Sequence, residues 1–187
     1  KLTTQGESNS NVGLNINNAS LNMHELNISG SNKGININFS KGFLNDVTIQ
    51  GNTESESGID IHNSTIDMNS LYINDNSQNG IRIHGSKGKI RNSDISGSRI
   101  GMSVIDGSFV ELYESINITN DNLQSGDEWC PSIDVYNSNL RSHASLNIIH
   151  NRTCGHGINM RYGNFHLSNL SITGVSENAH SLLSFSD

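Results

Sequence analysis

The sequence predicts an all-β protein, a parallel β-solenoid of about seven coils, because one short alternating pattern is repeated along it. The stretch Gly58–Ile73 contains three pieces in which apolar and polar residues alternate, beginning at Ile59, Ile66 and Leu71. Alternation with a period of two is typical of strands with one buried face. None of these pieces is long enough to bury its apolar face alone, so each coil must be covered by its neighbours.

The pattern recurs at intervals of 21 to 31 residues. Each repeat begins with a small residue, followed by an apolar residue, any residue and a second apolar residue; the repeats start at Gly13, Gly34, Gly58, Gly80, Gly101, Ser132 and Gly157. A third inward position is isoleucine in all seven repeats: Ile28, Ile49, Ile73, Ile95, Ile118, Ile148 and Ile172. We therefore expect three strand pieces per coil and columns of stacked apolar residues as the core.

One domain is expected, with residues 1–12 as a lead-in or cap and residues 13–187 as the solenoid. The fifth repeat is the longest and contains a loop insertion at 121–131, which holds the only tryptophan, Trp129. Insertions in solenoids project as loops on one side, often the binding side. Trp129 is therefore expected either to contact a ligand or to cover a hydrophobic seam.

Composition excludes some classes of function. The formal net charge of −7 disfavours nucleic-acid binding, which depends on neutralising phosphates, and 5% aromatic residues are too few for a base-stacking surface. No run of 18 apolar residues is present, so no membrane-spanning segment is expected. The chain starts with a polar stretch instead of a signal peptide, which favours a mature or excised form.

The two cysteines occupy near-equivalent places in adjacent coils. Cys130 lies two residues before the sixth repeat and Cys154 three residues before the seventh. Adjacent coils are about 5 Å apart, which suits the Cα separation of a disulfide. We predict a Cys130–Cys154 disulfide and hence an oxidising compartment. A zinc site made by the cysteines with His150 and His156 lacks the usual CxxC spacing.

Polar residues that point outward from the first strand of each coil form a candidate ligand-binding strip. Stacking places Asp60 beside Arg82, and His62 beside His84. The strip as a whole comprises Asp60, His62, Arg82, His84, Asp134, Tyr136 and Arg161. It could bind sugar hydroxyls through bidentate hydrogen bonds and ring stacking, or it could be a solvated face with ordinary cross-strand pairs. Because a metal at the two histidines has no assured third ligand, neither a metal nor a cofactor is expected.

The sequence matches known enzyme motifs only weakly. Gly155-His156-Gly157 resembles the GHG segment of polygalacturonases and Gly80–Ile83 resembles their RIK segment, but the order is reversed and the paired aspartates are missing. Asp60 and Asp134 lie three coils apart, about 14 Å, whereas inverting hydrolysis needs carboxylates about 6.5–9.5 Å apart. The sequence favours a non-catalytic protein. A polysaccharide lyase or glycoside hydrolase acting at the insertion and His156 is the alternative.

Over residues 13–187 the chain resembles the right-handed parallel β-helix superfamily, which has the pectin-lyase-like fold, through its Gly-x-apolar spacing. Within that superfamily, the Asn-, Ser- and Ile-rich coils and the single cysteine pair are similar to the passenger of an AIDA-type autotransporter adhesin. The resemblance implies a right-handed three-stranded parallel β-helix, export to the bacterial cell surface or the extracellular space, and adhesion or self-association. Its partners would be a glycan, a host surface ligand or a second copy of the chain. The membrane barrel of that family is missing, so we expect a fragment.

Overall fold

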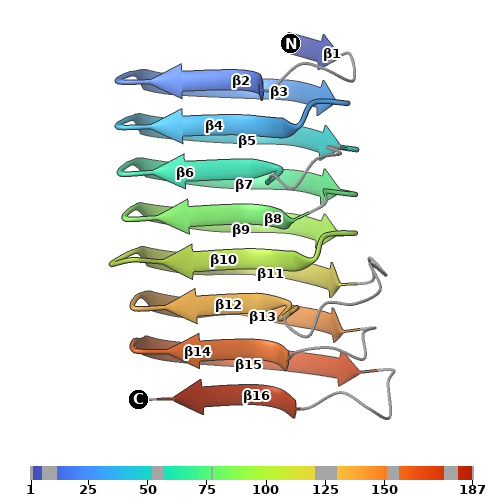
Figure 1. Cartoon of the computed structure of the whole chain (residues 1–187), viewed down its shortest axis with the longest axis vertical. Helices are drawn as coiled ribbons and strands as arrows, with labels where there is room; N and C mark the ends of the chain where they lie inside the picture. The colour runs from blue at the N-terminus through green and yellow to red at the C-terminus, as the bar shows by residue number, and fades with distance from the viewer. Residues whose placement is uncertain are drawn as a thin grey trace.

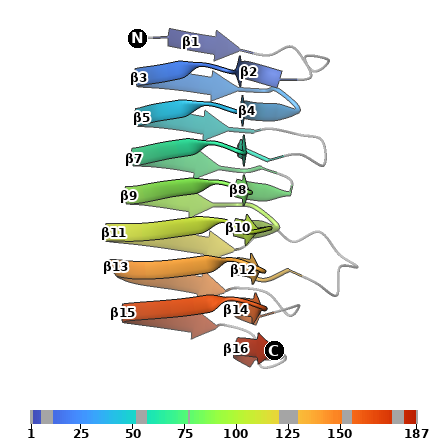
Figure 2. The ribbon, with the colours of Figure 1, turned by 90° about the vertical axis from the view of Figure 1, so that its left-hand side faces the viewer.

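The protein is a parallel β-solenoid, as predicted from the repeats, and it has about six turns (Figures 1 and 2). The computed structural model describes residues 2–5, 12–51, 57–76, 78–120, 130–150, 156–174 and 181–186. Every element in these ranges is a strand, and the strands form two parallel eight-stranded sheets. The handedness of the winding stays a prediction, as does the number of coils.

The chain alternates between a sheet of short strands and a sheet of long strands. The short-strand sheet contains β2 (Val12–Asn17), β4 (Lys33–Asn38), β6 (Ile59–His62), β8 (Asn79–His84), β10 (Ile100–Ile105), β12 (Ile133–Tyr136), β14 (His156–Arg161) and β16 (Ser181–Ser186). The long-strand sheet contains β1 (Leu2–Gln5), β3 (Ser20–Ser29), β5 (Lys41–Gln50), β7 (Thr65–Asn74), β9 (Lys87–Ser96), β11 (Phe109–Asn120), β13 (Asn139–His150) and β15 (Asn164–Gly174). Each strand pairs with the equivalent strand of the next coil.

Each long strand joins two of the three predicted strand pieces. In β7, Ile66 and Met68 face the core before the joint, and Leu71 and Ile73 face it after the joint. Strict alternation would bury residues 70 and 72 instead, but Ser70 has a left-handed backbone with a φ of 55°. That one residue resets the alternation, so both pieces bury their apolar side chains. Left-handed residues occupy the same place in four other coils: Glu25, Asp46, Asn92 and Glu114.

The predicted apolar columns are confirmed by the register. The isoleucines of the third position pair directly from Ile28 to Ile172 through every intervening coil. From Ile28 to Ile148 none of these side chains is more than 1% exposed. The column that begins at Leu14 is equally regular, and its last pair joins Ile158 to Leu183. Stacked columns thus replace the core of a globular domain.

The small residue that opens each repeat leaves room for the isoleucine column. A methyl group on Gly80 would lie 2.3 Å from Cγ2 of Ile95 and 2.7 Å from the carbonyl oxygen of Gly101. Both contacts are far inside van der Waals distance, and the second is with backbone. A methyl group would approach the isoleucine of the same coil in the same way at Gly13, Gly58 and Gly101.

We predict that Gly80→Ala lowers the free energy of unfolding by about 1–3 kcal/mol, because the added methyl group overpacks this junction. Chemical denaturation measures the change. Gly85→Asn is the matched control: Gly85 lies in a turn where the equivalent residues of three other coils, Asn18, Asn63 and Asn137, are asparagines with left-handed backbone. Equal losses in the two variants would contradict the packing explanation.

Candidate functional site

The outward strip of the short-strand sheet has the predicted register. Asp60 pairs with Arg82, and His62 pairs with His84. Trp129 lies outside the described residues, so its role stays a prediction. The strip is divided by Ser103 and Ile105 of β10, which separate its polar residues into two groups. We call them the histidine cluster (Lys33, Asp60, His62, His84 and Asp106) and the tyrosine patch (Asp134, Tyr136, Asn159, Arg161 and Tyr162).

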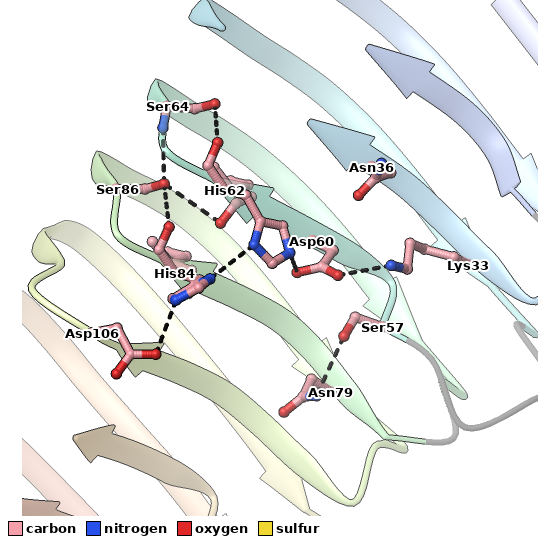
Figure 3. A network of polar contacts seen from close by, with 12 residues as sticks. Lys33, Asn36, Ser57, Asp60, His62, Ser64, Asn79, His84, Ser86 and Asp106 are labelled. Atoms are coloured by element: carbon pink, nitrogen blue, oxygen red, sulfur yellow. Dashed lines mark hydrogen bonds and ion pairs between the residues drawn. The ribbon is translucent and has the colours of Figure 1, made fainter. Parts of the chain in front are cut away.

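The histidine cluster is a chain of charged and polar contacts that crosses successive coils (Figure 3). Lys33 Nζ donates to Asp60 Oδ2 at 2.8 Å, and Asp60 Oδ1 lies 2.9 Å from His62 Nε2. His62 Nδ1 and His84 Nδ1 are 2.9 Å apart, and His84 Nε2 lies 2.9 Å from Asp106 Oδ2. The two imidazoles therefore lie between two carboxylates.

Asp60 is more enclosed than an outward position in a strand suggests, with only 2% of its surface exposed. Burial alone would raise the pKa of this carboxyl group. The hydrogen bond and charge of Lys33, together with His62, outweigh burial, so the pKa of Asp60 lies below its ordinary value. Although Arg82 is its neighbour in the ladder, no ion pair joins Asp60 to Arg82 among the described residues. The long side chain of Lys33 reaches the carboxylate from the preceding coil.

A column of buried serines holds the turn that follows the histidines. Ser64 Oγ donates to the carbonyl oxygen of His62 at 2.6 Å, and Ser86 Oγ donates to that of His84 at 2.8 Å. The backbone N–H of Ser64 in turn donates to Ser86 Oγ at 3.0 Å, which ties the two coils together (Figure 3). These serines were not among the candidate site residues of the sequence. Their spacing is the signal that could have found them, since serine recurs in this turn in five successive coils: Ser40, Ser64, Ser86, Ser108 and Ser138.

The tyrosine patch lies on β12, β14 and the turn after β14. The rings of Tyr136 and Tyr162 pack edge to face, with centroids 5.7 Å apart. The guanidinium of Arg161 lies 5.2 Å from the centre of the Tyr136 ring, within the range of a cation–π contact. Beside it, Asn159 Nδ2 donates to Asp134 Oδ1 at 2.6 Å, and Arg161 Nη2 is 3.9 Å from the same oxygen. The patch combines aromatic faces with fixed hydrogen-bonding groups.

Asp134 differs from Asp60 although both occupy the same outward row. Burial raises the pKa of the Asp134 carboxyl group, and the hydrogen bond from Asn159 and the charge of Arg161 only partly oppose this effect. The difference follows from the partners. Asp60 has a lysine ammonium at hydrogen-bonding distance, whereas Nη2 of Arg161 is 3.9 Å from Oδ1 of Asp134.

Tyr162 belongs to the patch but was missed in the sequence. It follows β14, in a turn position with left-handed backbone, and has a φ of 54°. Other coils place Asn18, Asn63, Asp106 and Asn137 at this position, which are residue types that tolerate such a backbone. An aromatic residue that interrupts this Asn/Asp turn column is the signal that could have found it. Phe39 is a second such interruption.

A groove of about 700 Å³ follows the same turns at the other end of the solenoid. Its lining includes Phe39, Asn63 and two cationic residues, Lys41 and Lys87. The strip residues that the sequence singled out are not part of its lining. The groove shows that the turns, as well as the flat sheet face, offer accessible surface.

The separation of the two carboxylates does not suit inverting hydrolysis by this pair. Three ladder steps separate Asp60 from Asp134, which corresponds to about 14 Å. The site of the alternative enzyme lies mostly outside the described residues, because the insertion up to Trp129 and Gly155 are not among them. The same holds for Cys154; its predicted partner Cys130 is buried, and the disulfide stays a prediction.

No protein-family model and no curated protein matches the chain. The structure supports the β-solenoid architecture, whereas the resemblance to autotransporter adhesins rests on the sequence pattern alone. The described part of the chain contains no apolar helix long enough to cross a membrane.

Proposed function

We propose that this chain is part of an exported bacterial surface adhesin that binds carbohydrate without catalysis, and that the tyrosine patch is its binding site. The observation that carries this proposal is the grouping of Tyr136, Tyr162 and Arg161 around Asp134. The resemblance of the coils to autotransporter passengers and the predicted disulfide support an extracellular or cell-surface location.

The chemistry of the patch suits a sugar. The apolar face of a pyranose ring stacks on an aromatic ring, while its hydroxyl groups need donors and acceptors at fixed positions. Tyr136 and Tyr162 supply exposed rings, and Arg161 and Asp134 supply a donor and an acceptor on adjacent strands. Because the strands belong to a continuous ladder, these groups are held in place before a ligand arrives.

The backbone of Tyr162 adds a second argument. A bulky residue with positive φ carries a conformational cost that asparagine largely avoids. The tyrosine side chain is 58% exposed, so burial does little to offset this cost. A contact with a ligand would explain why an aromatic residue occupies this turn.

We predict that Tyr162→Asn retains or slightly increases the thermal stability of the protein but weakens glycan binding at least about tenfold, which corresponds to 1.4 kcal/mol. A glycan array identifies the best ligand, and calorimetric titration with that glycan measures the affinity of each variant. Tyr136→Ala is expected to have a similar effect, since it removes the other ring.

Tyr72→Ala is the matched control, because Tyr72 is an exposed tyrosine on β7 in the opposite sheet. Equal affinity of all three variants for the glycan would refute the assignment of the patch. If the array shows no glycan binding but Tyr162→Asn abolishes concentration-dependent association of the chain, the patch is instead a self-association surface. Reducing sugars or unsaturated products released from polysaccharides would favour the enzymatic alternative.

A further inference from the structure

The histidine cluster contains two ring nitrogens that face each other across neighbouring coils. Nδ1 of His62 and Nδ1 of His84 are 2.9 Å apart, and the two rings are almost perpendicular, at 89° (Figure 3). Both side chains are partly accessible to solvent, with 25% and 36% of their surfaces exposed. A small solute can therefore reach part of each ring.

The hydrogens on the two rings follow from their outer partners. Nε2 of His62 lies against Asp60 and Nε2 of His84 lies against Asp106, both at 2.9 Å. In each ring a hydrogen on Nε2 would face a carboxylate oxygen, although Oδ1 of Asp60 accepts no hydrogen bond of good geometry. In that tautomer each neutral imidazole has a lone pair on Nδ1. Either a hydrogen shared by the two Nδ1 atoms or a metal ion would then hold them together.

The separation of the nitrogens discriminates between metal ions. With bonds of about 2.0–2.1 Å to nitrogen, two ligands at 90° to each other are about 2.9 Å apart, whereas two tetrahedral ligands are about 3.4 Å apart. The observed 2.9 Å is the length of a direct N–H···N hydrogen bond, and it also equals the separation of adjacent positions around a square-planar or tetragonal ion. That geometry is typical of Cu(II) and Ni(II) with nitrogen and oxygen ligands, and Cu(II) binds most tightly in the divalent series.

We propose that His62 and His84 form a binding site for a divalent transition-metal ion, Cu(II) in preference to Zn(II), with the two Nδ1 atoms as adjacent ligands and water in the remaining positions. The proposal is independent of carbohydrate binding, since the tyrosine patch lies beyond β10. It departs from the sequence-based expectation that no metal binds, although the two histidines still have no third protein ligand among the described residues. In the described part of the chain no group of three or more His, Cys, Asp or Glu is arranged around a metal, so water would supply the rest.

The surroundings of the two rings are those of ligating histidines. Metal-binding histidines commonly donate their other N–H to a carboxylate, which fixes the tautomer and increases the basicity of the ring. Asp60 and Asp106 occupy those positions. The rings also need little reorganisation, because the ladder pairs His62 with His84 and the serine column anchors both of their carbonyl groups.

The test is calorimetric titration of the untagged 187-residue chain with a copper(II) salt, together with electron paramagnetic resonance of the complex. The wild-type protein is expected to bind one Cu(II) at this site with two nitrogen ligands, and Zn(II) more weakly. His62→Gln and His84→Gln should each weaken Cu(II) binding at least about tenfold and leave a single nitrogen ligand. Asp106→Asn should weaken it about 10- to 100-fold through His84.

His143→Gln is the matched control, because His143 also lies near a carboxylate, Glu111, but on the long-strand sheet. Unchanged affinity in both His62→Gln and His84→Gln would overturn the proposal, as would a wild-type spectrum with fewer than two nitrogen ligands. Circular dichroism confirms that each variant is folded. If the histidine variants fail to fold, Asp106→Asn decides instead, since its side chain is 48% exposed, and unchanged affinity there overturns the site.

Discussion

Replacing Ile148 by alanine is expected to lower the free energy of unfolding by about 2–5 kcal/mol, whereas the same replacement at the adjacent Ile149 should cost less than about 1 kcal/mol. Ile148 is 1% exposed and belongs to the isoleucine column, while Ile149 is 41% exposed on the outer face of the same strand, β13. Truncation at Ile148 removes buried methyl groups and leaves a cavity between Ile118 and Ile172, its neighbours in the ladder. Truncation at Ile149 creates no cavity.

Urea denaturation of the two variants measures this difference. The comparison is stringent because the two residues are chemically identical and adjacent in sequence, so propensity and composition cancel. In a solenoid each coil contacts only its neighbours, so the loss at Ile148 has few other contacts to absorb it. Similar losses at the two positions would mean that the column is not the main source of stability.

The second large effect is expected at the two buried aspartates of the outward row. Asp60→Asn should lower the free energy of unfolding by about 2 kcal/mol at neutral pH, because it removes the charge-assisted hydrogen bond between this carboxylate and the partly buried Lys33. Asp134→Asn should instead be neutral or stabilise the fold by about 1 kcal/mol, because it removes a carboxylate whose burial is poorly compensated.

The two carboxyl groups contribute to the stability of the fold with opposite pH dependence. The pKa of Asp60 is lowered by folding, so its contribution to stability is present above its ordinary pKa of 3.8 and is lost as the pH falls through the folded-state pKa. The pKa of Asp134 is raised by folding, so the fold prefers the protonated form. Its favourable contribution is present below 3.8 and is lost as the pH rises through the folded-state pKa.

Denaturation between pH 3 and pH 7, with a chelator present to keep the histidine cluster free of metal, separates these cases. The loss caused by Asp60→Asn should shrink as the pH falls, and any gain from Asp134→Asn should also vanish at low pH, because protonated aspartic acid resembles asparagine. A destabilising effect of Asp134→Asn at neutral pH larger than that of Asp60→Asn would contradict the argument from their partners.

The predicted register was correct for every column, including the pairing of His62 with His84. Stacking required only the spacing of the apolar residues, because sliding a strand by one position would turn its whole apolar set outward. The continuous long strands were not predicted. Ser70, Asp46 and the equivalent left-handed residues do not share a residue type that marks the joint.

The candidate site was only partly predictable. Neighbours in the ladder were assigned correctly, but Asp60 found its partner in Lys33, which is 27 residues away and not its neighbour in the row. Asp106 and Tyr162 belong to the clusters but lie in turns. The alternation that places strand residues does not show which way the side chain of a turn residue points. Side-chain length and turn geometry decided these contacts.

The sequence by itself determined which residues stack, because a thin apolar column tolerates only one register and that register recurs at every coil. Only the tertiary structure decided which polar groups meet, since the outward face imposes no such restriction and each side chain takes the best partner within its reach. The opposite pKa shifts of Asp60 and Asp134, two equivalent positions in one row, are the consequence: the same residue type meets an ammonium group in one coil and a more distant guanidinium in another.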